Sequence, residues 1–236
     1  MEKLLPMAEQ LDRAAVELRL DHPIHNRLAI ILIDNAVELM AKEALFVHTA
    51  IGGDYCGITA KHRKMARSRN LHQQLAVLTF VGELTPLEAE FVLAAHDHRN
   101  SAYHEGYAGE PYQRQLAFLY YEFACSYVAR FTKAFYSWSS NFQYTEIGRR
   151  YHEATSDSDQ LLGKIDRAKL AAMLLNQLPD PSAISEAANV LPITMELATT
   201  AMTANTANLV ASPKCPRVRA TAAQIASVSS RPGPIS

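Results

Sequence analysis

Glycine and cysteine are both scarce in this chain, and each scarcity excludes a class of protein. Nine glycines in 236 residues are too few for the many tight turns of a β-sandwich or a β-barrel. The three cysteines, Cys56, Cys125 and Cys215, are odd in number and far apart. They therefore indicate neither a disulfide framework nor a zinc site, and a reducing environment is expected.

Long hydrophobic runs are also missing. The longest ones, such as residues 28–33, are far too short to span a bilayer. The first residues, 1–6, lack the apolar core of a signal peptide. These two absences predict a cytoplasmic protein without a membrane partner.

Acidic residues are absent after Glu196, although the chain as a whole carries a formal charge of only −1. Residues 1–196 contain 19 of the 23 basic residues and all 24 acidic ones, so their net charge is about −5. Residues 211–236 are rich in Ser, Ala and Pro and retain the basic side chains. We therefore expect residues 211–236 to form a disordered basic tail.

What the sequence does contain is helical periodicity almost throughout. A start signal is clearest at Thr85, Pro86 and Glu88, which suit the N-cap, N1 and N3 positions of a helix. The helices predicted span about residues 3–20, 24–49, 58–82 (one or two helices), 85 to the segment at 99–104, 111–138 and 158–178. A polar connection is expected over 139–156.

This pattern predicts an all-α protein, an up-and-down bundle of long helices with a C-terminal helical extension and a flexible tail. The predicted bundle covers residues 1–155, the helical extension 156–210 and the tail 211–236. The central helix, 24–49, is apolar nearly all round, and its polar residues fall on one stripe: Asp34, Asn35, Glu38 and Lys42. We expect an ordinary ion-paired stripe there, although Asp34 and Glu38 are also in position to raise the pKa of His104.

The candidate active site is the segment Arg99-Asn100-Ser101-Ala102-Tyr103-His104. A fixed guanidinium can hold a phosphate, and an imidazole can move protons near neutral pH. Together they suit phosphodiester chemistry without a metal. Arg67 and His72 have the same spacing, so the spacing alone does not identify a site. The interpretation depends on the position of the segment between two apolar helices.

With Arg99, Asn100 and His104 in this position, and residues 32–40 in the earlier helix, the chain resembles the HEPN superfamily over roughly residues 20–140. The resemblance implies a metal-independent endoribonuclease without cofactors, a toxin or phage-defence effector that works as a homodimer and has a cognate antitoxin or other protein partner. RNA brings its own nucleophile, the 2′-hydroxyl, so a base, an acid and the phosphate-neutralising Arg99 suffice. Gly106 stands where one branch of the superfamily has a Tyr that is nucleotidylated, so that mode of control is not expected.

Helix geometry sets a condition on this site. Five residues along an ideal helix rotate by about 500°, so Arg99 and His104 would sit about 140° apart. We therefore predict that the helix ends or bulges between them and that two copies of the chain face each other across a dimer cleft.

Other functions stay open. Lys61, Arg63, Lys64 and Arg67 form a basic patch that would bind RNA, or simply a solvated helix face. A non-catalytic helical module that binds nucleotide, RNA or a protein is the main alternative. His96-Asp97, with His72 and Asp157, also suggests a metal-dependent HD-type phosphohydrolase, and His96, His98 and His104 a metal cluster.

Overall fold

The computed structural model describes residues 4–51, 57–105, 112–131, 145–155 and 165–178, with side chains of the second range described as far as Ser101. These residues form eight α-helices and one π-helical turn, and no β-strand occurs among them. The predicted all-α bundle is confirmed. No helix in the described part is both long and apolar enough to cross a membrane.

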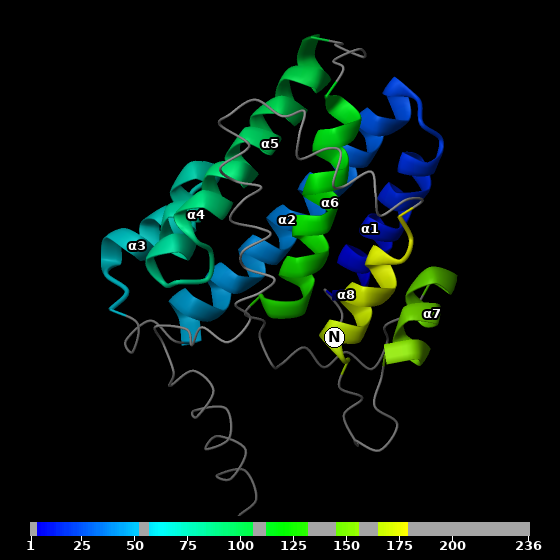
Figure 1. The fold of residues 1–236 in the computed structure, drawn as a ribbon. Coiled ribbons are helices and arrows are strands. Elements are labelled where there is room, and N and C mark those ends of the chain that lie inside the picture. The colour runs from blue at the N-terminus through cyan, green and yellow to red at the C-terminus, as the bar shows by residue number, and fades with distance from the viewer. Residues whose placement is uncertain (1–3, 52–56, 106–111, 132–144, 156–164, 179–236) are drawn as a thin grey trace, which may run out of the picture.

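The helices follow the predicted order along the chain. Their bounds are α1 Leu4–Arg19, α2 Pro23–Phe46, η1 Val47–Ile51, α3 Ala60–Ala66, α4 Leu71–Phe80, α5 Pro86–Glu105, α6 Gln113–Arg130, α7 Glu146–Thr155 and α8 Arg167–Leu175. Figure 1 shows α3 and α4 on one side of the bundle and α7 and α8 on the other. The central helix α2 packs against α1, α4, α5 and α6, as expected for a helix that is apolar nearly all round.

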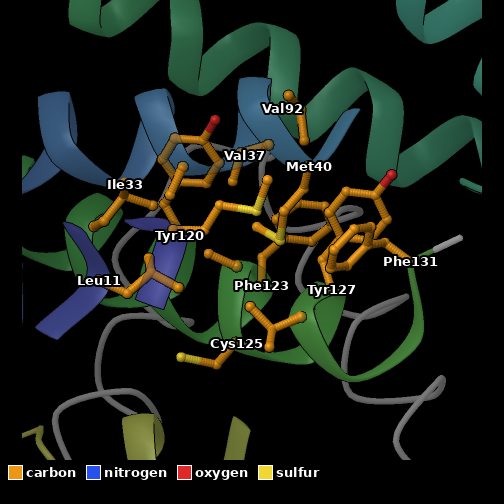
Figure 2. Close-up of a cluster of buried hydrophobic side chains, with 14 of the residues drawn as sticks. Leu11, Ile33, Val37, Met40, Val92, Tyr120, Phe123, Cys125, Tyr127 and Phe131 are labelled. Atoms are coloured by element: carbon orange, nitrogen blue, oxygen red, sulfur yellow. The ribbon is translucent and has the colours of Figure 1, made fainter. Parts of the chain in front are cut away.

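The core is built around an aromatic row on α6. Tyr120, Phe123, Tyr127 and Phe131 are spaced three or four residues apart, so they lie along one side of α6, and each is at most 1% exposed. Ring centroids of neighbours in this row lie 5.7–6.3 Å apart. Figure 2 shows the row against Ile33, Val37 and Met40 of α2. Phe135 and Trp138, also predicted for this helix, lie outside the described residues.

The start of α5 is held by the capping box that the sequence predicts. The backbone N–H of Thr85 donates to Glu88 Oε2 at 2.8 Å, and the N–H of Glu88 donates to Thr85 Oγ1 at 3.2 Å. Arg130, at the end of α6, donates to the other oxygen of Glu88 at 2.5 Å. This ion pair joins the first turn of α5 to the last turn of α6.

The polar connection predicted over 139–156 is wrong in its second half, because α7 occupies residues 146–155. Few apolar residues mark this helix, which contacts α1 through the buried Tyr151 and through several polar side chains. Tyr151 donates to Asp12 Oδ1 at 2.5 Å, and Arg150 also binds this carboxylate. Thr145 donates to Glu9 at 2.6 Å.

The described part of the predicted C-terminal extension belongs to the same core as α1 and α6. Leu170 and Leu174 of α8 are fully buried, and Tyr121 of α6 donates to the backbone carbonyl of Leu174 at 2.9 Å. Residues 179–236, which include the rest of the extension and the basic tail, lie outside the described residues.

Candidate functional site

The Arg99–His104 segment forms the last part of α5. The helix runs unbroken to Glu105, so the predicted break or bulge between Arg99 and His104 is wrong. The reason lies in the local sequence. Residues 99–105 contain no glycine or proline, and each of them is compatible with a helix. On this backbone the Cα positions of residues 99 and 104 are about 140° apart around the helix axis. The side chain of His104 lies outside the described ones.

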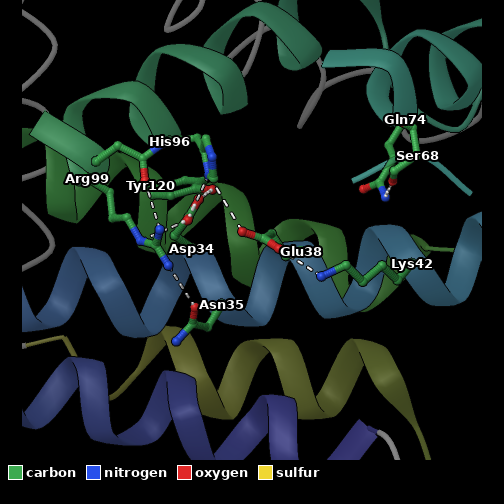
Figure 3. Close-up of polar contacts among 10 residues, drawn as sticks. Asp34, Asn35, Glu38, Lys42, Ser68, Gln74, His96, Arg99 and Tyr120 are labelled. Carbon is green, nitrogen blue, oxygen red and sulfur yellow. Dashed lines mark hydrogen bonds and ion pairs between the residues drawn. The ribbon is translucent and has the colours of Figure 1, made fainter. Parts of the chain in front are cut away.

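The centre of the candidate site is the carboxylate of Asp34, on α2. Asp34 is fully buried, and a buried charge must be paired to be tolerated. Tyr120 of α6 donates to Asp34 Oδ1 at 2.9 Å, and His96 Nδ1 of α5 lies 3.0 Å from Asp34 Oδ2. Figure 3 shows side chains of α5 and α6 converging on this carboxylate of α2.

Arg99 completes this cluster. Its Nε lies 3.4 Å from Asp34 Oδ2, and its two terminal nitrogens donate to Asn100 at 2.8 Å and to Asn35 at 3.3 Å. Its side chain is 25% exposed, so it is partly accessible to solvent. A guanidinium has five N–H donors. Among the described residues, one N–H on each terminal nitrogen of Arg99 is therefore left for a ligand.

His96 is held by its Nδ1, which leaves Nε2 without a hydrogen-bond partner among the described residues. The hydrogen bond with Asp34 raises the pKa of His96 above its usual 6.5, and the charges of Asp34 and Glu38 add to this. Burial and the charge of Arg99 oppose the rise in pKa. The side chain is 18% exposed, so the imidazole can exchange a proton with a bound molecule.

Tyr120 serves as a permanent donor in this cluster. Burial, followed by the charge of Asp34, raises the pKa of Tyr120 well above 10. The phenol therefore stays protonated and donates to Asp34 throughout the physiological pH range.

The two acidic residues of the polar stripe on α2, Asp34 and Glu38, make different contacts. Glu38 accepts from Lys42 at 2.8 Å, which confirms the ion pair expected at this spacing. Asp34 instead contacts Arg99 of the predicted motif, and the histidine whose pKa is raised is His96.

The cluster also brings together three side chains that could ligate a metal. Oxygen or nitrogen atoms of Asp34, Glu38 and His96 all lie within 4.8 Å of one another. Of the side chains named for metal binding, His98 packs its ring against Tyr112, with centroids 5.6 Å apart, and Asp97 is exposed. Asp157 lies outside the described residues.

The basic patch lies elsewhere. Lys61, Arg63 and Lys64 are on α3, Arg67 is its C-cap, and Arg63 Nε donates to the carbonyl of Thr49 at 3.5 Å. Thr49 follows Asp34 by fifteen residues along α2 and η1, a rise of roughly 20 Å. The patch and the Asp34 cluster are therefore separate surfaces.

Sequence reasoning did not pair His96 with Asp34, although two features point that way. Asp34 is a carboxylate within an apolar helix, and such a residue needs a buried partner. His96 and Arg99 are three residues apart, which places them on one face of α5. The spacing of residues within each helix does not predict which helix packs against Asp34.

Comparison of the chain with protein-family models, with curated proteins and with solved structures finds no match.

Proposed function

We propose that this protein is a metal-independent endoribonuclease of the HEPN type, acting at the Asp34 cluster and the end of α5. The observation that carries the proposal is that His96 and Arg99 lie side by side on α5, both oriented by the buried Asp34. A proton-transfer group thus stands next to a cation that retains free donors. These are two of the elements that cleavage of a phosphodiester requires.

The reaction follows from the chemistry of RNA. The 2′-hydroxyl attacks the adjacent phosphorus and gives its proton to His96 Nε2, while the P–O5′ bond breaks. The leaving 5′-oxygen takes a proton from a second group, which we assign to His104. The products are a 2′,3′-cyclic phosphate and a 5′-hydroxyl, with no external water or metal needed.

Arg99 would hold the scissile phosphate. Each terminal nitrogen keeps one N–H for a phosphate oxygen, and a guanidinium can donate to two oxygens of one phosphate. Asn100 and Asn35 accept from the same nitrogens and fix the plane of the group. Asn100 is therefore a positioning residue in this proposal.

Two copies of the chain would form each site. Because α5 is unbroken, residues 99 and 104 of one chain occupy positions about 140° apart around the helix axis. A two-fold axis near the end of α5 would bring His104 of a second copy to the phosphate held by Arg99.

The position of Arg99 argues against a metal at Asp34, Glu38 and His96. A divalent ion there would sit beside the guanidinium, whose Nε is 3.4 Å from Asp34 Oδ2, and the two positive charges would repel each other. EDTA therefore separates this proposal from a metal-dependent phosphohydrolase.

The test is cleavage of fluorescently labelled RNA by the purified full chain in EDTA, with the new ends analysed for cyclic phosphate. We expect Arg99→Ala, His96→Gln and His104→Ala each to slow cleavage by at least about 100-fold, the usual effect of losing such a group. His152→Gln, on α7, is purified in parallel as the control and should cleave normally. Cleavage only with added metal would support the phosphohydrolase, and RNA binding without cleavage the non-catalytic module.

A mixing experiment tests the shared site. Unfolded Arg99→Ala and His104→Ala chains are refolded together, so that half of the dimers contain one chain of each kind. If Arg99 and His104 act across two copies, one intact site forms in each mixed dimer, and about a quarter of the wild-type activity returns. If both residues act within one chain, the mixture stays inactive.

A further inference from the structure

The α3–α4 hairpin is the most positively charged part of the described chain. Residues 57–82 contain no Asp or Glu, but they contain Lys61, Arg63, Lys64, Arg67 and Arg69. A local charge of +5 thus occurs in a chain whose total is −1. A concentrated patch of one sign attracts a partner of the opposite sign.

Four of these cations form an exposed surface that we call the basic face: Lys61, Lys64, Arg67 and Arg69. The first three follow each other at intervals of three residues, so they lie along one side of α3 and its C-cap. In the described ranges, the side chains of these four residues have no ion-pair or hydrogen-bond partner. By contrast, Arg19, Arg114 and Arg130 each bind an oxygen of the protein.

An aromatic pair lies between α3 and α4 of the same hairpin. The rings of His62, on α3, and Phe80, at the end of α4, have centroids 4.1 Å apart with an angle of 35° between their planes. The orientation of the His62 ring is fixed by a hydrogen bond, because its Nδ1 accepts from the backbone N–H of Thr59 at 3.3 Å. Phe80 is 49% exposed, so part of its ring is open to solvent.

A row of cations and an exposed aromatic ring on one hairpin are the combination that binds a single-stranded nucleic acid. The cations contact successive phosphates and release counterions, while a base stacks on the ring. A duplex keeps its bases stacked inside and would use only the charges. A membrane-binding helix would expose an apolar face, whereas Ala66 of α3 is buried and Met65 packs against the core.

We infer that the basic face and the His62–Phe80 pair form a docking surface for an unpaired RNA strand, roughly 20 Å along α2 from Asp34. The inference rests on the RNA substrate proposed above and specifies it: a single-stranded region long enough to reach both surfaces. Docking at a distance from the cleavage site would select for RNA that carries an unpaired stretch beside the scissile bond.

Binding is measured by fluorescence anisotropy with a short 2′-O-methyl oligonucleotide, free or annealed to its complement, over a range of salt concentrations. The methyl group blocks the nucleophile, so binding is read whether or not the chain cleaves. We expect tighter binding of the single strand than of the duplex. With three to four phosphate contacts, the logarithm of its affinity should fall with the logarithm of the salt concentration at a slope of about −2 to −3.

Two variants separate charge from stacking. The triple variant Lys61→Gln/Lys64→Gln/Arg67→Gln should flatten the slope by about 2 and weaken binding at least tenfold at low salt. Phe80→Leu should weaken single-strand binding by roughly tenfold and leave the slope unchanged. The control, Arg149→Gln/Lys169→Gln, removes two exposed positive charges from α7 and α8 and should bind like the wild type.

Equal binding of duplex and single strand, a Phe80→Leu variant that binds normally, or a triple variant that matches the control would each overturn the inference. Stronger binding to phosphatidylserine vesicles than to RNA at the same salt concentration would do so as well. A chain that binds through the basic face but leaves ordinary RNA intact would refute only the proposed cleavage. A chain that cleaves RNA regardless of these variants would refute only the docking surface.

Discussion

At the scale of single residues, the protein is organised around a few buried carboxylates that each serve several partners. Asp34 binds His96, Arg99 and Tyr120, which come from two different helices. Asp12 binds Arg150 and Tyr151 in the same way. Because a buried charge is costly without partners, each carboxylate makes its neighbours depend on one another.

The pKa of His96 should depend mainly on Asp34. In the variant Asp34→Asn, we expect this pKa to fall, because the hydrogen bond that is the largest cause of the rise loses its charged acceptor. A titration of the imidazole followed by NMR measures the shift. Glu38→Gln is the matched control and should lower the pKa less, since the charge of Glu38 is a smaller cause. Equal shifts in the two variants would contradict the assignment.

At the scale of elements, specific side chains hold the ends of the helices. The same motif, the capping box, differs in strength from one helix to another. Thr59 and Thr85 both cap a helix through a capping box. The box at Thr59 is exposed, whereas Glu88 in the box at Thr85 is buried and also binds Arg130. The cap of α5 is therefore tied to the core through Glu88, whereas the cap of α3 is exposed to solvent.

Removing these two caps should have unequal effects on stability. We expect Thr85→Ala to lower the free energy of unfolding by about 1–2 kcal/mol and Thr59→Ala by about 0.5 kcal/mol, the upper and lower parts of the usual range for a lost N-cap. Urea denaturation followed by circular dichroism measures both. A larger loss for Thr59→Ala would show that burial does not decide the strength of the cap.

The attachment of α7 should be separable from the rest of the fold. In Asp12→Ala, Arg150 and Tyr151 lose their common acceptor, so α7 should open locally more often. Hydrogen–deuterium exchange should then be faster for the amides of α7, with α5 unchanged. Glu9→Ala removes only the contact with Thr145 and is the milder comparison. Uniformly faster exchange in the whole chain would mean that α7 unfolds together with the core.

At the scale of the whole molecule, the Asp34 cluster links the stability of the bundle to pH. The pKa of His96 in the folded protein is raised above 6.5, its usual value in an unfolded chain. The folded state therefore binds the proton more tightly than the unfolded state. This contribution to stability is complete below about pH 6.5 and is lost as the pH rises through the folded pKa of His96.

This linkage gives a measurable pH profile. The difference in free energy of unfolding between the wild type and His96→Gln should be largest below about pH 6.5 and decline at higher pH. Urea titrations at a series of pH values measure it. A difference that stays constant with pH would show that His96 does not gain a proton on folding.

The sequence by itself determined the helical class, the number and order of most helices and the start of α5, because these depend on periodicity and capping within a short stretch of chain. It also marked Arg99 and the polar stripe on α2. It missed α7, which is attached to α1 more than a hundred residues earlier in the chain. Only the tertiary structure decided that Asp34 faces His96 and Arg99. Which faces of distant helices meet depends on how the whole core packs, and no local pattern records that.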